Sequence, residues 1–189
     1  KEAEELKVEW GRPITAAPIA EKLATGAFDA LTLVHNETST GVLNPVQEIA
    51  ALAHEQGAIV VVDAVTSLGG MPLDVGAWGL DAVYSCSQKG LGAPSGMAPI
   101  VFSGRARTRA ASRSFYFDLR LLEQYWAGRK YHHTIAAPLV YALREAVVSV
   151  EEMVGKIKAA VDTRRDADMV IIARSDARAI EGLQATIDR

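Results

Sequence analysis

Residues 58–63 read AIVVVD, and this stretch decides the fold class. Its four consecutive β-branched residues are typical of a strand that is buried on both faces, as the strands of parallel sheets are. The run ends in Asp63, which places an acidic side chain at the carboxyl end of the strand. Similar apolar runs at 28–34, 81–87 and 97–103 alternate with helix-like segments. The sequence therefore predicts an α/β fold with a mostly parallel sheet covered by helices.

A helix is expected immediately before the AIVVVD strand. Asn44 can cap this helix, Pro45 suits its first position, and Gln47 completes the spacing of a capping box. Gly57 is expected to end the helix, because glycine adopts the left-handed conformation in which helices commonly finish.

The composition describes a globular chain. It has 189 residues, 49% of them hydrophobic, and 20 Lys and Arg against 23 Asp and Glu give a net charge of −3. These values predict one soluble domain, or one and a half, and exclude disorder and a fibrous repeat. The slight acidity argues against a broad nucleic-acid-binding surface. The exception is RARTRAASR (105–113), whose arginines we interpret as a solvated helix face.

The cysteine content and the hydropathy of the sequence predict the cellular compartment and whether the chain enters a membrane. The single cysteine, Cys86, cannot form an internal disulfide, which fits a reducing environment, so we expect a cytoplasmic protein. The charged start, KEAEELKVEW, does not resemble a signal peptide. No apolar run approaches the roughly 20 residues that span a bilayer. We therefore expect neither a membrane nor a nucleic-acid partner.

Three polar loops follow the expected strands: HNETSTG (35–41), DAVTSLGG (63–70) and SQKGLGAPSG (87–96). Loops at the carboxyl ends of parallel strands converge and form ligand sites. Here they offer Asp63 at a strand end, Lys89 in a Gly-rich loop and several hydroxyls, which are the components of a pyridoxal phosphate site. A lysine amine condenses with the aldehyde of that cofactor, and a carboxylate keeps its pyridine nitrogen protonated.

Taken singly, these residues also have ordinary interpretations. Most loop lysines are solvated, and most strand-end aspartates form caps or turns. Thr38 and Ser87 can equally be structural hydroxyls of a loop and a strand end. His132 and His133 are adjacent, so in a strand they would point to opposite faces, and no cysteine or acidic residue stands at ligand spacing. We therefore expect no metal site.

The sequences of three longer segments indicate a protein family more specifically than any single residue does. VHNETSTGVLNP (34–45), VVVDAVTSLGGMPLDVGAWGLDAVYSCSQKGLGAPSG (60–96) and YHHTIAAPLVYALRE (131–145) closely resemble the class V branch of the fold-type I pyridoxal phosphate enzymes. Within this class V branch, the three segments most resemble alanine–glyoxylate and serine–glyoxylate aminotransferases. The resemblance runs from about Val8 to about Ala146. It implies the central part of that family's large domain, with helices on both faces of the sheet, and pyridoxal 5′-phosphate as cofactor.

The resemblance also implies roles for individual residues. Lys89 matches the lysine that attaches the cofactor covalently and moves the proton at the substrate α-carbon. Asp63 matches the partner of the pyridinium nitrogen, and Gln88 the residue that lies along the ring. The implied reaction transfers an amino group from alanine or serine, which the sequence does not separate, to glyoxylate. The implied small-molecule partners are thus an amino acid and a 2-oxo acid.

Further cofactor contacts are implied by the same resemblance. Thr38 is similar to the hydroxyl residue beside the cofactor's phenolic oxygen, and Ser87 to one near the phosphate. Tyr131 and Thr134 match residues that reach the phosphate bound by the neighbouring subunit. The resemblance therefore implies a homodimer with shared cofactor sites.

Two parts of the family pattern have no match in this sequence. The Gly-rich phosphate loop and the aromatic residue stacked on the ring would precede its first residue, and a small domain with the substrate-binding arginine would follow. We therefore expect a truncated aminotransferase. A catalytically dead fragment that acts only by association stays open as an alternative.

The last forty or so residues resemble a different family. From about residue 148, and above all at ARSDA (173–177), the sequence resembles the isocitrate lyase, methylisocitrate lyase and phosphoenolpyruvate mutase superfamily, with Arg174 matching a ligand of the substrate carboxylate. This implies a βα piece of a (β/α)8 barrel, which needs roughly 200 residues to close. We expect two parts, 1–147 and 148–189. A carbon–carbon lyase is the alternative function, and an inert tail is the simpler interpretation.

Overall fold

The computed structural model describes residues 3–146. The expected lyase-like part, 148–189, lies outside the described residues, as does Arg174. The described chain forms two compact units, which we treat separately. Unit 1 contains the chain up to Ala64 together with Asp74–Ser85 and Pro99–Ala136, and unit 2 contains Val65–Leu73, Cys86–Ala98 and, among the described residues, α5 (Ala137–Ala146).

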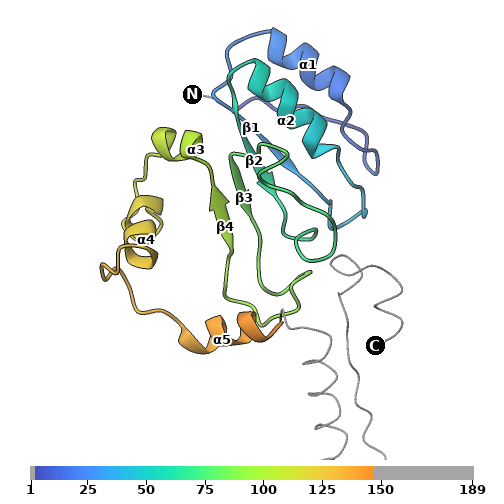
Figure 1. Cartoon of the computed structure of the whole chain (residues 1–189). Helices are drawn as coiled ribbons and strands as arrows, with labels where there is room; N and C mark the ends of the chain where they lie inside the picture. The colour runs from blue at the N-terminus through green and yellow to red at the C-terminus, as the bar shows by residue number, and fades with distance from the viewer. Residues whose placement is uncertain (1–2, 147–189) are drawn as a thin grey trace, which may run out of the picture. The chain divides into compact units, whose positions relative to one another are not determined.

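Unit 1 is built on a four-stranded sheet, shown in Figure 1. Its strands are β1 (Ala30–Val34), β2 (Ile59–Asp63), β3 (Ala82–Tyr84) and β4 (Ile100–Phe102), in the order β1-β2-β3-β4. The first three strands are parallel, and β4 is antiparallel to β3. The predicted α/β fold with a mostly parallel sheet is confirmed.

The core of unit 1 lies between β2 and the helix that precedes it. This helix, α2 (Val46–Glu55), buries Ile49 completely, and β2 buries Val60 and Val62 completely. A second helix, α1 (Ala16–Ala24), packs beside α2 (Figure 1), and it buries Ile19 and Leu23. The AIVVVD run thus forms the strand that its apolar side chains predict.

The start of α2 differs from the prediction. Pro45 occupies the position before the first helical residue, and Asn44 does not cap the helix. Instead, the Asn44 side chain accepts a hydrogen bond from the Ile14 backbone at 2.9 Å and donates one to the Val34 carbonyl at 2.8 Å. Because both ends of the amide are used to tie other segments to the end of β1, the side chain is not available as a cap. Gly57 does follow the helix, with a φ of 74°.

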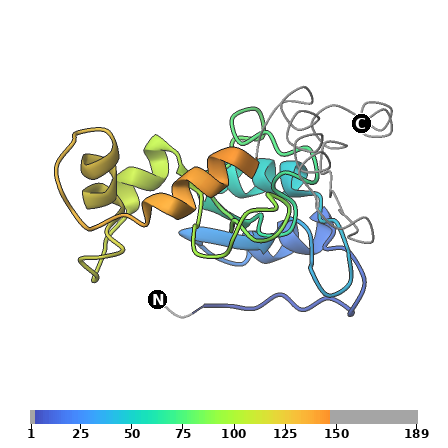
Figure 2. The ribbon, with the colours of Figure 1, turned by 90° about the horizontal axis from the view of Figure 1, so that it is seen from below.

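Two short helices follow β4. In α3 (Gly104–Arg109), the Ser103 hydroxyl caps the start by accepting from the Ala106 backbone, and Asp118 caps α4 (Leu119–Trp126) by accepting from the Arg120 and Leu121 backbone. An ion pair of 2.9 Å between Arg107 and Glu123 links the two helices. Figure 2 shows α3 and α4 together, away from α1.

Unit 2 consists mainly of two loops whose backbones touch. Gly69 has a φ of 84°, and a Cβ there would lie 3.1 Å from the Gly90 carbonyl oxygen. A Cβ at Gly90 would collide with the Leu68 carbonyl oxygen. Only glycine tolerates this approach at both positions, so the glycines of DAVTSLGG and SQKGLG allow the two loops to lie this close together. Among residues 3–146, no helix is long and apolar enough to cross a membrane.

Candidate functional site

The carboxyl ends of β2 and β3 in unit 1 carry a carboxylate and a phenol. Asp63 and Tyr84 are register partners in the parallel ladder, so their side chains extend from neighbouring positions on one face of the sheet. The Tyr84 hydroxyl donates to Asp63 Oδ2 at 2.9 Å. Burial, then the hydrogen bond to Asp63 and the Asp63 charge, raise the pKa of Tyr84 above its usual range. Tyr84 therefore remains a donor at neutral pH.

The loop after β1 presents Thr38 at the surface of unit 1. The loop closes through an isolated bridge between Asn36 and Leu43, and Glu37 accepts hydrogen bonds from the Ser39 backbone at 3.0 Å and the Ser39 hydroxyl at 2.6 Å. These two bonds lower the pKa of Glu37, the side-chain bond contributing most. The loop is thus internally fixed, and the exposed Thr38 lies on it.

A buried histidine lies directly before this loop. His35 packs edge-on against Trp78, with ring centroids 5.6 Å apart, and burial lowers its pKa, which favours the neutral imidazole. Its Nδ1 has no hydrogen-bond partner within the described chain. These surroundings fit a structural role for His35 in the packing of unit 1.

The loop in unit 2 that carries Ser87, Gln88 and Lys89 is organised around the first of these residues. Ser87 is fully buried, its hydroxyl donates to the Pro94 carbonyl at 2.6 Å, and it accepts from the Met97 backbone at 3.3 Å. Gln88 and Lys89 are exposed. The Ser87 hydroxyl proton is therefore engaged within the loop itself. The phosphate contact of Ser87 stays a prediction.

Two residues predicted to act together do lie together in unit 1. The Tyr131 hydroxyl and Thr134 Oγ1 are 3.1 Å apart, and both side chains are exposed. The Tyr131 ring also lies edge-on to Tyr125, with centroids 6.3 Å apart. The short segment YHHT thus presents two hydroxyls from one small surface region.

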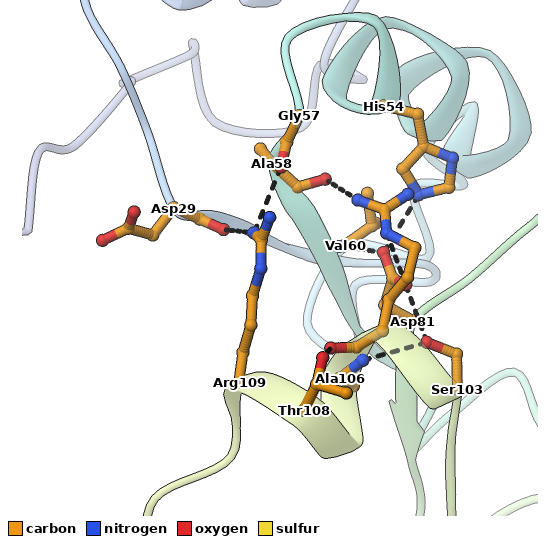
Figure 3. A network of polar contacts seen from close by, with 11 residues as sticks. Asp29, His54, Gly57, Ala58, Val60, Asp81, Ser103, Ala106, Thr108 and Arg109 are labelled. Atoms are coloured by element: carbon orange, nitrogen blue, oxygen red, sulfur yellow. Dashed lines mark hydrogen bonds and ion pairs between the residues drawn. The ribbon is translucent and has the colours of Figure 1, made fainter.

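A second carboxylate, Asp81, lies at the opposite end of β3 and is buried in a network of donors (Figure 3). Asp81 accepts from the Val60 backbone at 3.0 Å, from the Ser103 hydroxyl at 2.8 Å and from His54 Nε2 at 3.0 Å. Burial raises its pKa, but these hydrogen bonds and the Arg105 charge outweigh burial, so that the pKa is lowered overall. The local sequence pattern does not predict this network, and its only signal is the acidic residue before the apolar strand.

This network contains the residue types of a catalytic triad, but its hydrogen bonds do not connect them in the order found in a triad. In a nucleophilic triad the histidine bonds both the serine and the acid. Here Ser103 and His54 both bond the carboxylate of Asp81. The arrangement therefore anchors α2, β2 and the start of α3 to one buried charge, and we assign it a structural role.

The arginine cluster at 105–113 contacts other segments of unit 1 through two of its side chains. Arg105 donates to the Ala58 carbonyl at 2.9 Å, and Arg109 donates to the carbonyls of Asp29 and Gly57 at 3.2 and 3.1 Å (Figure 3). These carbonyls lie at the ends of segments that enter β1 and β2. All four arginines of the cluster are exposed, as the sequence predicts, and two of them also bind backbone oxygen atoms of other segments.

This chain is similar in sequence to a known family of enzymes. The family model for class V aminotransferases matches residues 3–184. The (S)-ureidoglycine–glyoxylate transaminase of Bacillus subtilis is 35% identical over 171 residues, 78% of this chain and 41% of the relative. The alanine–glyoxylate aminotransferase of Oryctolagus cuniculus is 38% identical over 151 residues, 75% of this chain and 38% of the relative.

Solved structures give the same result. The crystal structure of alanine–glyoxylate aminotransferase from Nostoc sp. superimposes with a TM-score of 0.71 and 43% identity, covering 75% of this chain and 39% of that one. This chain spans about two fifths of the length of these relatives. These matches give no support to the lyase alternative. The chain belongs to the class V aminotransferases, a family of pyridoxal-phosphate-dependent enzymes.

Proposed function

We propose that this chain carries the cofactor-binding part of an aminotransferase that transfers an amino group from alanine or serine to glyoxylate. The observation that carries this proposal is the match to glyoxylate-using relatives across the segment that contains both Asp63 and Lys89. Glyoxylate is common to the names of the Bacillus and rabbit relatives, whereas the named donors differ. The acceptor is therefore better supported than the donor.

The residues present fit pyridoxal phosphate by their chemistry. Unit 1 offers the Asp63 carboxylate at a strand end, where it accepts a hydrogen bond from Tyr84. Unit 2 offers the exposed Lys89 amine on a loop whose neighbouring Gly90 lies close to the backbone of the loop at 65–73. Unit 2 also contains the Ser67 hydroxyl, which is buried without a hydrogen-bond partner among residues 3–146. A carboxylate, a primary amine and an unsatisfied hydroxyl are groups that this cofactor uses.

Each proposed residue then has a defined task. When bound, pyridoxal phosphate supplies an aldehyde for the amino group and a ring that accepts electron density from the substrate α-carbon. Lys89 Nζ would attach to the aldehyde carbon and, once released by the substrate amine, would move the proton at the α-carbon. Asp63 would hold the proton on the ring nitrogen, with Gln88 along the ring and Thr38 near its phenolic oxygen.

The assembly and compartment are part of the same proposal. Tyr131 and Thr134, whose hydroxyls lie 3.1 Å apart, would bind the cofactor phosphate of a neighbouring copy in a homodimer. Residues 1–147, which contain every proposed cofactor contact, would carry this function. The unpaired Cys86 supports a cytoplasmic setting.

The experiment that tests the proposal is covalent mapping of the cofactor. The purified chain is mixed with pyridoxal phosphate, its visible spectrum is recorded, and the product is reduced with borohydride and mapped by peptide mass. We expect one adduct, on Lys89, which Lys89→Ala abolishes. The matched control is Lys130→Ala, because Lys130 is also an exposed lysine in a loop. Labelling scattered over surface lysines, or none, would show a catalytically dead chain instead.

A further inference from the structure

Tyr84 lies in direct contact with the carboxylate that the proposed function places on the cofactor ring. Its hydroxyl donates to Asp63 Oδ2 at 2.9 Å, and the two residues are register partners at the ends of β2 and β3. None of the roles carried over from the family resemblance falls on Tyr84. The contact therefore needs its own explanation.

A solvent-accessible phenol has water as an alternative hydrogen-bond partner. The Tyr84 side chain is 41% exposed, yet its hydroxyl is directed at Asp63. The parallel register brings the two backbones side by side, and the ring spans the remaining distance to the carboxylate. A hydrogen bond to an ionised acceptor is stronger than one between neutral groups, so this contact restricts the rotation of the carboxylate.

We propose that Tyr84 is a positioning residue, which holds the Asp63 carboxylate in one orientation for the nitrogen of the cofactor ring. The proposal rests on the proposed role of Asp63. Tyr84 itself does not touch the reacting atoms. It acts through Asp63, so its contribution must vanish when the carboxylate is removed.

The contact is tested first without cofactor. Because the Asp63 charge helps to raise the pKa of Tyr84, Asp63→Asn should lower that pKa toward the ordinary tyrosine value. Tyrosine labelled with 13C at Cζ, titrated by NMR and assigned with Tyr84→Phe, measures this directly. An unchanged Tyr84 titration in Asp63→Asn would overturn the proposed contact.

The functional consequence is tested by a double-mutant cycle on the dissociation constant of pyridoxal phosphate. We expect Tyr84→Phe to weaken binding about 3- to 10-fold in the parent chain, the range for one lost hydrogen bond, and less than about 2-fold in the Asp63→Asn background. Tyr141→Phe is the matched control, because Tyr141 is an exposed tyrosine on α5. It should leave the dissociation constant unchanged. Thermal melting of each variant checks that all of them fold.

The outcomes separate the two proposals. If Asp63→Asn weakens binding but Tyr84→Phe does not, Tyr84 has no positioning role and the role of Asp63 stands. If Tyr84→Phe weakens binding equally with Asp63 and with Asn at that position, the effect does not pass through the carboxylate and the inference is wrong. If the parent chain binds no pyridoxal phosphate, or Asp63→Asn binds as tightly as the parent, the role of Asp63 and this inference fail together.

Discussion

Two neighbouring strands each have an aspartate at one end, and the two aspartates lie at opposite ends of the sheet. Their carboxylates differ in burial and in their hydrogen-bond partners. Asp81, before β3, is 1% exposed and accepts hydrogen bonds from three different segments. Asp63, at the end of β2, is only partly buried and accepts from Tyr84. A buried charge surrounded by donors supports the fold, whereas a partly exposed one at the carboxyl end of a parallel strand remains accessible to a ligand.

Removing the buried carboxylate should have the largest effect on stability. Asp81→Ala leaves the Val60 amide, the Ser103 hydroxyl and the Arg105 charge without their acceptor. We expect a loss of about 3–5 kcal/mol in the free energy of unfolding, measured by urea denaturation, because breaking a buried ionic network leaves its other members uncompensated. Asp74→Ala is the control, since its single exposed bond to Ala77 should be worth less than about 1 kcal/mol. Equal losses in the two variants would contradict the structural role.

Loss of one donor from the network should cost less. Ser103→Ala removes both the cap of α3 and a hydrogen bond to Asp81. We expect about 1–2 kcal/mol, the usual range for a lost helix cap. Ser103→Thr, which retains a hydroxyl, should recover part of this loss. If both substitutions cost the same, packing at that position rather than the hydroxyl would matter.

The pH dependence of stability should identify the same carboxylate with a smaller effect. The folded-state pKa of Asp81 is lowered, so the unfolded chain binds its proton first as the pH falls. The stabilisation is therefore complete above the unfolded value of about 3.9 and is lost as the pH falls through the folded pKa. Its slope is at most about 1.4 kcal/mol per pH unit. Urea midpoints between pH 5 and 2 should decline less steeply in Asp81→Asn, and parallel declines would be evidence against this assignment.

The sequence predicted the scaffold of the site better than its contacts. A β-branched run such as AIVVVD forms a strand almost regardless of context, and the observed strand starts one residue later than predicted. The bond between Tyr84 and Asp63 depends on the register of two strands 21 residues apart, which local periodicity does not contain.

The contacts that the sequence did not predict have a common physical origin. Asn44 carried the local signature of a helix cap, but its amide is used by Ile14 and Val34. Arg105 and Arg109 are exposed as predicted, but their guanidinium groups also bind carbonyls of distant segments, which the local pattern does not indicate. Polar side chains can satisfy either a local or a long-range partner, and tertiary packing decides between them. The roles predicted for Lys89 and the other cofactor contacts still await experiment.

The most direct test of the contrast between the two carboxylates measures both properties in both variants. Asp63→Asn and Asp81→Asn are each characterised by urea unfolding and by titration with pyridoxal phosphate under conditions where the chain is folded. We expect Asp63→Asn to lose about 10-fold or more in cofactor affinity, the range for a hydrogen bond to a charged group, with less than about 1 kcal/mol of stability. Asp81→Asn should lose stability and keep its affinity within about 2-fold. The opposite pattern, with Asp81 controlling affinity and Asp63 only stability, would contradict the account.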